Sequence, residues 1–268
     1  MALPEPADTS TVLVTGASSG IGEEIARQLA ERGYGLTLVA RREDRLKALA
    51  DEVYETHGVR AEHIAADLGS DQGRDEMLAK VEALDLDVEI LVNNAGFGGS
   101  GPVHRSDPAR LASMVALNCE TLVYLQASLS PAMADRGRGA IINIASTAAF
   151  QPIPYTSNYA ATKAFVLSLS EGTHNELSGK GVTVTAVCPG PVKTEFAEQA
   201  GVGGANDKLP GFIWTDVEQV ARDAVEGADK GSRVVVPGLL NRAGSIMGQH
   251  TPRSVVLPLA KRAWRAAE

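Results

Sequence analysis

The sequence predicts an α/β fold in which a doubly wound, seven-stranded parallel β-sheet is flanked by helices on both faces. Seven short apolar runs occur along the chain, and helix-length segments separate nearly all of them. The runs are continuously apolar instead of alternating with polar residues, which is typical of parallel strands buried on both faces. Only 4% of the residues are aromatic, while Gly, Ala and Val are abundant. This composition favours a close-packed α/β domain over a β-sandwich.

The expected elements follow one another without a linker, repeat or low-complexity tract, so we expect one domain over residues 1–268. A glycine turn and a helix to about Arg32 follow the first strand, and an amphipathic helix runs from Glu43 to about Thr56. The predicted strands are residues 11–16, 35–40, 61–67, 88–96, 139–146, 181–190 and 232–238. Outside this alternation we expect a flexible N-terminus over residues 1–10, a substrate lid over residues 195–211, and a C-terminal extension over residues 239–268.

The charge and the cysteine content argue against several classes of function. The net charge is -8 and the pI is near 5.2, which makes nucleic acid an unsuitable partner. Residues 239–268 hold five basic residues against one acidic residue, which gives +4 and leaves -12 on the remainder. Two cysteines form neither a disulfide framework nor a metal motif. Without a visible signal peptide or a run of eighteen apolar residues, we expect a soluble cytoplasmic protein with no membrane span and no bound metal.

A glycine-rich stretch, TGASSGIG, lies between the first strand and the first helix. Glycines at this spacing permit a tight turn and a close approach of the backbone to a phosphate, while the free amides of the helix N-terminus favour an anion. The position between a strand and a helix is the context that a dinucleotide site requires. The alternative is a plain loop. The residues expected to bind the cofactor here are Gly16, Ser18, Ser19, Gly20, Ile21 and Gly22.

The end of the second strand indicates which dinucleotide is bound. An acidic residue about twenty positions after the glycines usually holds the ribose 2′-hydroxyl of NAD. This chain has Arg41 and Arg42 there instead. Arginines at the start of a helix oppose its dipole, and a bound phosphate would reverse that cost. We therefore expect NADP(H) to be preferred over NAD(H); the alternative is that both arginines are solvated charges and either cofactor is accepted.

Tyr159 and Lys163 stand four residues apart in a segment that reads as helix, so their side chains project from one face. A free phenol has a pKa near 10 and exchanges protons poorly at neutral pH. A positive charge about 4 Å away, at an effective dielectric of ~20, stabilises a phenolate by roughly 4 kcal/mol. We therefore expect Lys163 to lower the pKa of Tyr159 by about two units. The alternative is an ordinary surface pair on a helix.

These residues resemble a family, the short-chain dehydrogenase/reductases, in its single-domain form with a Rossmann-type fold. The resemblance covers Thr11 to Thr194 and rests on motifs that occur in the expected order: TGASSGIG, NNAG at 93–96, Ser146 before Tyr159, YAATK and PGPVKT. One feature bears on the cofactor. The residue before Gly20 is Ser19, which is not basic, so a preference for NADP(H) would depend on the two arginines.

The resemblance implies a role for each matching residue. Tyr159 resembles the general acid/base, Lys163 the partner that lowers its pKa and holds the nicotinamide ribose, and Ser146 the donor to the substrate oxygen. Asn118 resembles the helix asparagine that anchors a proton-relay water. The other residues that the resemblance places at the cofactor are Asp67, Leu68, Asn94, Ala95, Gly96, Pro189, Gly190, Val192 and Thr194.

Two of these roles have local alternatives. Asn118 falls on the face of an apolar stripe formed by Leu111, Val115, Leu122, Leu125 and Leu129. A buried amide there is costly unless it is hydrogen-bonded, so Asn118 could equally be an asparagine satisfied by backbone groups. Ser146 closes a strand, where a parallel sheet opens its ligand crevice, or it could simply cap the next helical turn.

The expected function is an NADPH-dependent interconversion of a ketone and a secondary alcohol, with a small-molecule substrate that is hydrophobic and ketoacyl- or steroid-like. Two alternatives remain open: a non-catalytic NADP(H)-binding sensor or scaffold, and an epimerase or dehydratase on the same fold. The resemblance implies a homodimer or homotetramer through the helices that carry Asn118 and Tyr159. In the C-terminal extension an apolar face could pack on a subunit or on the domain itself, or associate with lipid. The aromatic residues that could line the substrate side are Phe97, Phe150, Phe196, Phe212 and Trp214.

Overall fold

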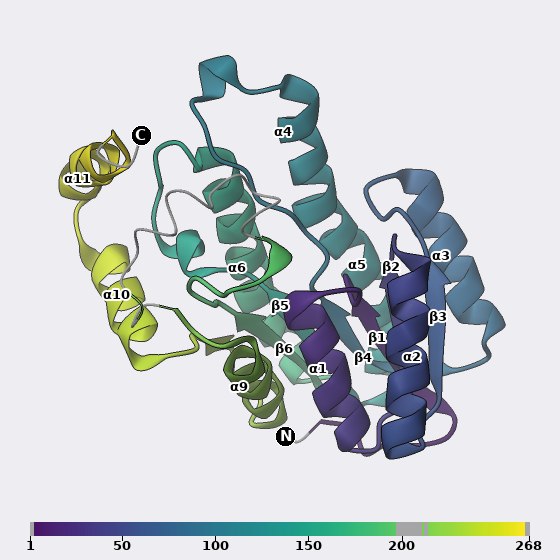
Figure 1. The fold of residues 1–268 in the computed structure, drawn as a ribbon. Helices are drawn as coiled ribbons and strands as arrows, with labels where there is room; N and C mark the ends of the chain where they lie inside the picture. Colours follow the sequence, from purple (N-terminus) through teal and green to yellow (C-terminus); the bar gives the residue numbers. More distant parts are fainter. Residues whose placement is uncertain (1–2, 197–210, 212–213, 266–268) are drawn as a thin grey trace.

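A seven-stranded, entirely parallel sheet forms the centre of the molecule (Figure 1). The structure, a computed structural model, describes residues 3–196, 211 and 214–265, without the side chains of 263–265. The strand order is β3-β2-β1-β4-β5-β6-β7. The strands are β1 (Ser10–Thr15), β2 (Leu36–Ala40), β3 (Ala61–Ala65), β4 (Asp87–Asn93), β5 (Gly139–Ile144), β6 (Val182–Val187) and β7 (Val234–Val235).

Helices cover both faces of this sheet, as a buried parallel sheet requires. The first face carries α1 (Gly20–Glu31), α2 (Glu43–His57) and α9 (Val217–Asp229), whose apolar residues share one core with alternate residues of the strands. The second face carries α3 (Asp71–Ala83), α5 (Thr121–Arg136) and α6 (Ser157–Ser178). The shorter elements on this side are η1 (Val103–Arg105), α4 (Pro108–Val115), η2 (Ala116–Glu120) and η3 (Thr147–Phe150).

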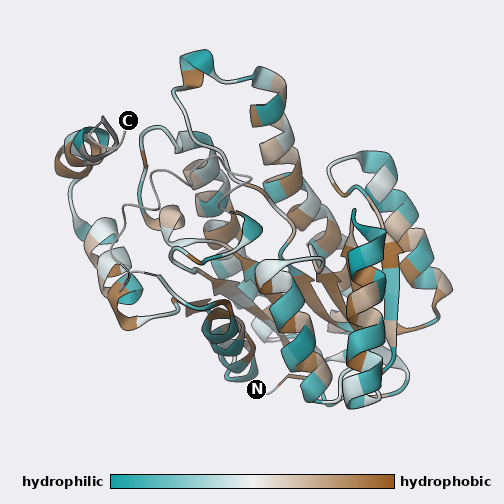
Figure 2. Cartoon of the chain, viewed as in Figure 1, coloured by the Kyte–Doolittle hydropathy of each residue, from teal (hydrophilic) through white to brown (hydrophobic). Residues whose placement is uncertain are grey.

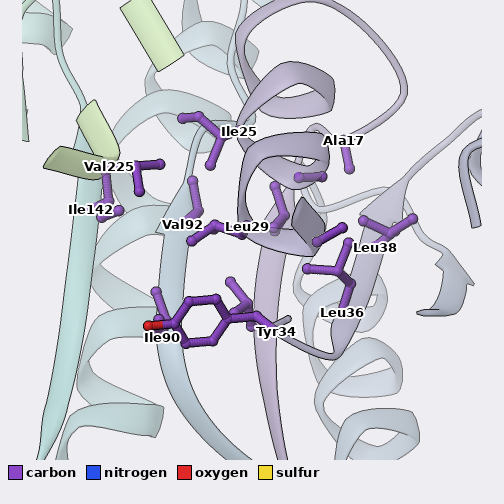
Figure 3. Close-up of a cluster of buried hydrophobic side chains, with 14 of the residues drawn as sticks. Ala17, Ile25, Leu29, Tyr34, Leu36, Leu38, Ile90, Val92, Ile142 and Val225 are labelled. Carbon is purple, nitrogen blue, oxygen red and sulfur yellow. The ribbon is translucent and has the colours of Figure 1, made fainter. Parts of the chain in front are cut away.

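The cores on the two faces explain why successive strand residues are all buried. In β1, Val12 and Val14 point into the first core, whereas Leu13 points into the second. Figure 3 shows Ile25 and Leu29 of α1 within the first core, beside residues of β2 and β4. Figure 2 shows the same division, with hydrophobic strands at the centre and polar colours on the outward helix faces. The prediction of a doubly wound parallel sheet is therefore confirmed.

Each of the seven predicted strands is present, but several end earlier than predicted. The fourth ends at Asn93 instead of residue 96, and the sixth ends at Val187 instead of residue 190. Beyond these points the chain turns out of the ladder at the carboxyl edge of the sheet. In a doubly wound sheet this edge is where ligands bind, so the residues lost from the strands are the ones available for a site.

Two segments differ from the sequence expectations. The apolar stripe around Asn118 is interrupted because η2 is a π-helical turn; such a turn holds one extra residue and shifts the register, which leaves Val115 exposed. The N-terminal segment is anchored from Leu3 onward: Leu3 is buried, and the Tyr34 hydroxyl donates to the Pro4 carbonyl at 2.8 Å. These contacts do not fit a flexible terminus over residues 3–10, since burial of Leu3 offsets the entropy of ordering it.

The C-terminal extension forms two helices, α10 (Leu239–His250) and α11 (Arg253–Arg265). Both lie at the side of the molecule, and α11 stands away from the sheet (Figure 1). Helix α10 packs next to η3, because a Cβ at Gly248 would lie 2.8 Å from Gln151 Oε1. In α11, Leu257 and Leu259 are exposed. None of the helices that the structure describes is both long and apolar enough to cross a membrane.

Candidate active site

The site lies at the point where the strand order reverses, between the carboxyl ends of β1 and β4. Thr15 and Asn94 join these two ends. The Thr15 hydroxyl donates to the Val92 carbonyl at 3.1 Å and accepts from the Asn94 and Ala95 amides at 3.0 and 3.1 Å. Asn94 Nδ2 donates to the carbonyls of Thr15 and Gly16 at 3.0 and 3.1 Å. The crevice therefore has a rigid floor before any ligand enters.

The glycines of the first loop are required by close contacts. A Cβ at Gly22 would lie 2.3 Å from Asn94 Nδ2 and 2.7 Å from the Gly16 carbonyl oxygen. Gly16 has a φ of 66°, a left-handed conformation that other residues rarely adopt, and its Cβ would meet Asn94 and Ala95. Gly96 is held equally closely, since its Cβ would lie 2.8 Å from Asn118 Oδ1. Only glycine fits at these positions. The exposed backbone that results can form a cradle for a phosphate.

The N-terminus of α1 faces this cradle with its amides available. Ser19 occupies the N-cap position, and its side chain makes no capping hydrogen bond. Beside it, Arg42 donates to the hydroxyls of Ser18 and Ser19 at 3.0 and 2.7 Å. Arg41, by contrast, is exposed. The structure thus brings Arg42, Ser18 and Ser19 together as a cluster of donors at the positive end of a helix, which suits a doubly charged phosphate.

The remaining cofactor candidates surround the same crevice with different degrees of access. Asp67 is exposed, and its carboxylate accepts from the Gly69 amide at 3.1 Å, whereas the Leu68 side chain is buried in the second core. Val192 forms a bridge with Thr215. The Thr194 side chain reaches the N-terminus of α1, 3.3 Å from the place of a Cβ on Gly20.

Ser146, Tyr159 and Lys163 gather where β5 ends. Helix α6 carries Tyr159 and Lys163 on one face, with Lys163 Nζ 5.8 Å from the centre of the Tyr159 ring. Lys163 Nζ donates to the Ile144 carbonyl at 2.7 Å, which fixes the buried amine under the end of β5. Ser146 interacts with the Tyr159 hydroxyl, accepts from the Ala148 amide at 3.1 Å and donates to the Pro189 carbonyl at 3.5 Å. Ser146 is thus a cap of η3 as well as a neighbour of the tyrosine.

The predicted effect of Lys163 on Tyr159 is wrong for the ligand-free protein. Removal from water raises the pKa of Tyr159 to about 12, although the hydrogen bond with Ser146 opposes this shift. Burial also lowers the pKa of Lys163 to about 8. This desolvation disfavours the charged forms of both side chains, and spacing along a helix does not reveal it. At neutral pH the phenol therefore holds its proton.

Asn118 is buried, and its side-chain amide is occupied by protein groups. Its Oδ1 accepts from the Phe97 amide at 3.0 Å, while Nδ2 donates to the Phe97 carbonyl and to Thr162 Oγ1, each at 3.0 Å. The Thr162 hydroxyl in turn donates to the Tyr159 carbonyl at 2.8 Å. These bonds agree with the alternative of an asparagine satisfied by its surroundings. They also link the loop after β4 to the backbone of the tyrosine.

A buried chain of polar side chains beneath the site was not predicted. Asn93 donates to Asn143 Oδ1 at 2.9 Å, and Asn143 donates to Gln126 Oε1 and Ser170 Oγ at 3.0 and 2.9 Å. These four residues connect β4, β5, α5 and α6. An asparagine within the apolar run GAIINI was the available signal, because a polar side chain in a doubly covered strand needs partners.

The predicted aromatic residues make different contacts, and one of them packs on the tyrosine. The Phe196 ring packs against Tyr159 with 5.7 Å between the ring centres, and Arg110 lies 5.3 Å from the centre of the Phe97 ring. Lys193 lies 6.0 Å from the centre of a Trp214 ring. Phe212 and most of the predicted lid, residues 197–210, lie outside the described residues. Of the predicted lid and its aromatic residues, Phe196 is therefore the one seen to contact a candidate catalytic residue.

The sequence also matches a known family. The family model for the short chain dehydrogenases matches residues 10–202, well over half of the chain. The chain belongs to this family. It is therefore an oxidoreductase that acts on alcohol or ketone groups, and the earlier resemblance is confirmed. Among the described residues of this short-chain dehydrogenase, no cluster of side chains is suited to hold a metal ion.

Individual relatives show how far the similarity extends. The chain is 39% identical over 188 residues to an NADP-dependent 3-hydroxy acid dehydrogenase from Salmonella typhi, which covers 69% of this chain and 74% of the relative. It is 37% identical to a short-chain dehydrogenase from Sphingobium yanoikuyae in complex with NADPH, with a TM-score of 0.81 and coverage of 89% and 92%. It is 32% identical to a bulky-bulky ketone specific alcohol dehydrogenase from Comamonas testosteroni, with a TM-score of 0.76 and coverage of 92% and 97%.

Proposed function

We propose that this short-chain dehydrogenase uses NADPH to reduce a bulky, hydrophobic ketone to a secondary alcohol. The observation that carries the proposal is the grouping of Ser146, Tyr159 and Lys163 at the end of β5, next to the glycine cradle. A donor pair beside a dinucleotide cradle suits hydride chemistry at a carbonyl carbon. The alcohol-to-ketone direction uses the same groups in reverse.

The cofactor is NADP(H), in agreement with the NADP-dependent relative and the NADPH complex described above. The glycine cradle fits a pyrophosphate because a Cβ at Gly16 or Gly22 would close it. Arg42, Ser18 and Ser19 would hold the 2′-phosphate, and Arg41 lies next to them. Lys163 would reach the nicotinamide ribose. When bound, the cofactor supplies the hydride that reduces the carbonyl carbon.

The protein's own part of the reaction is to bind the carbonyl oxygen and deliver a proton to it. Ser146 and Tyr159 both present hydroxyls, and the oxygen gains negative charge as the reaction proceeds. The Tyr159 phenol is protonated at neutral pH and can donate the proton that completes the alcohol. Lys163, held by the Ile144 carbonyl beside the ring, stabilises the phenolate left behind.

The substrate class follows from the apolar surface beside the tyrosine and from the relatives. Phe196 packs on Tyr159, and Phe150 in η3 packs against the third core cluster next to α6. Helix α10 borders η3 on the outside. An apolar wall of this kind favours a ketone with two large substituents, as the name of the Comamonas testosteroni relative also suggests.

Two measurements test the proposal. Titration of tryptophan fluorescence with NADPH and NADH determines which nucleotide binds more tightly, and absorbance at the NADPH band then screens bulky ketones, 3-oxoacyl thioesters and steroids. We expect tight NADPH binding and its stoichiometric oxidation by at least one bulky ketone. Binding without oxidation would favour the sensor, and conversion of a substrate without net oxidation would favour an epimerase or dehydratase. Failure to bind either nucleotide would refute the site.

We also propose a homodimer or homotetramer formed through η2, α5 and α6. Three large apolar residues of these elements are exposed, Val123, Tyr124 and Phe165, and so is Val115, which directly precedes η2. Covering them in an assembly would be favourable. Light scattering after size exclusion of Phe165→Glu checks this, with a shift toward monomer expected. We also propose a cytoplasmic location, because the two cysteines are buried and free, as is usual in a reducing compartment.

A further inference from the structure

Glu195 is an acidic residue within the expected phosphate site. Its two carboxylate oxygens form ion pairs with two arginines, Oε2 with Arg42 Nη1 and Oε1 with Arg45 Nη1, each at 2.7 Å. Arg42 is the same residue that donates to Ser18 and Ser19 beside the N-terminus of α1. A carboxylate that bridges two guanidinium groups offers them negative charge and oxygen acceptors, as a phosphate does, but with one charge where the phosphate carries about two.

The chain around Glu195 crosses the cofactor crevice. Thr194, the preceding residue, lies against Gly20 at the start of α1, and Phe196, the following residue, packs on Tyr159. Glu195 comes after β6, whereas its partners stand at the start of α2, after β2. The ion pair with Arg42 therefore links the segment that contacts Tyr159 to the arginine that contacts Ser18 and Ser19.

We propose that Glu195 is an internal competitor of the cofactor's 2′-phosphate and a determinant of cofactor specificity. Its carboxylate offsets one of the two positive charges of Arg42 and Arg45 in the free protein, and it releases Arg42 when NADPH binds. The ion pair between Arg45 and the Glu195 carboxylate persists during this exchange. The inference rests on the proposed placement of the 2′-phosphate at Arg41 and Arg42.

The electrostatics of the group support an exchange of this kind. Hydrogen bonds from Arg42 and then Arg45 lower the pKa of the Glu195 carboxyl, so it remains ionised and does not release the arginines by protonation at neutral pH. All three side chains keep substantial contact with water, with 34%, 45% and 41% of Arg42, Arg45 and Glu195 exposed. Exposed pairs contribute little each, so a ligand carrying two charges can displace them.

NADH would gain nothing from this exchange. Its ribose carries a hydroxyl, which cannot replace the carboxylate on Arg42 and adds no charge. Glu195 therefore lowers the affinity for the phosphorylated cofactor specifically, and its removal strengthens the preference for NADPH. A role limited to the local fold would affect both nucleotides equally.

Binding of two nucleotide fragments to the full chain tests the inference without turnover. Adenosine 2′,5′-bisphosphate carries the 2′-phosphate, and 5′-AMP lacks it; isothermal titration gives both dissociation constants. For Glu195→Gln we expect bisphosphate binding to tighten about three- to tenfold, while AMP binding changes less than about twofold. The matched control is Glu43→Gln, which removes the same charge from a residue adjacent to Arg42 that forms no ion pair within the described part of the chain. It should change neither constant more than about twofold.

Two further variants separate the inference from the placement that it depends on. Arg42→Gln should abolish the preference for the bisphosphate; if the preference survives, the 2′-phosphate binds elsewhere and the inference is wrong with it. If Arg42→Gln abolishes the preference but Glu195→Gln leaves it unchanged, the placement holds and Glu195 is no competitor. Arg45→Gln should weaken bisphosphate binding in the wild type and have no effect in a Glu195→Gln background. Equal weakening in both backgrounds would also refute the exchange.

Discussion

Replacing Asn118 with alanine is a sharp test of how the site is held together. The change removes three hydrogen bonds of 3.0 Å, two of them to the backbone amide and carbonyl of Phe97 and one to Thr162. The two Phe97 groups would lose their partners, at about 1–3 kcal/mol for each group that stays shielded from water. Thr162 still donates to the Tyr159 carbonyl, so its loss is smaller. We expect a total destabilisation of about 2–4 kcal/mol.

Urea unfolding, followed by circular dichroism at one protein concentration, measures this loss as a lower midpoint with an unchanged slope. The matched control is Asn175→Ala. This exposed asparagine donates to the Glu171 carbonyl at 2.9 Å, and its removal should cost less than about 0.5 kcal/mol. Turnover of the Asn118 variant should fall by at least tenfold or so, because the backbone of Tyr159 loses its tie to the loop after β4.

Two results would contradict this reasoning. A loss of stability below about 1 kcal/mol would mean that water replaces all three bonds and that the asparagine does not hold the loop. Unchanged stability with abolished turnover would instead assign Asn118 to the chemistry itself, as a water-anchoring residue. The experiment therefore distinguishes the two roles that the sequence left open.

Three further outcomes are expected at the same site. Tyr159→Phe should lower the rate of ketone reduction by about 10²–10⁴ with unaltered NADPH affinity in a fluorescence titration; retained turnover would exclude it as the proton donor. Burial lowers the pKa of Lys163 to about 8, whereas in the unfolded chain its pKa is about 10.5. Between these two pH values the folded protein has therefore lost a proton that the unfolded chain still holds. Stability of the wild type should therefore rise relative to Lys163→Met by up to about 1 kcal/mol between pH 8 and 9 in urea titrations, and parallel curves would refute this. Gly22→Ala, which forces a Cβ to within 2.3 Å of Asn94, should cost about 1–3 kcal/mol and weaken NADPH binding more than tenfold, unlike an alanine at the unhindered Gly172.

The architecture could be predicted from the sequence because it follows from local patterns. Each continuous apolar run became a strand, and the glycine-rich segment after the first run became a turn into α1. The glycine-rich loop was equally accessible, since its residues are adjacent in the chain. The grouping of Ser146, Tyr159 and Lys163 needed the family resemblance, because Ser146 lies thirteen positions before Tyr159, on the other side of η3.

Other features depend on contacts that no local pattern encodes. The ion pairs of Glu195 join residues separated by 153 and 150 positions. The π-helical turn at η2 lies in a sequence whose apolar spacing is that of an ordinary α-helix, so the exposure of Val115 was not visible. The pKa of Tyr159 was missed for a different reason: a Coulomb estimate from spacing omits the cost of desolvation, which only a folded environment determines.

The assembly of the crevice from distant strands has a consequence for folding. The base of the crevice is formed by the ends of β1 and β4, which are joined by the hydrogen bond between Thr15 and Asn94. It therefore cannot form until about the first ninety residues have been synthesised. The wall at Thr194 requires a hundred residues more. Such non-local pairing makes parallel sheets slow to fold. A ribosome-bound chain would therefore gain affinity for the nucleotide late in synthesis and in one step, when β6 joins the sheet. The nucleotide would then bind and stabilise fully folded molecules but not partly folded ones.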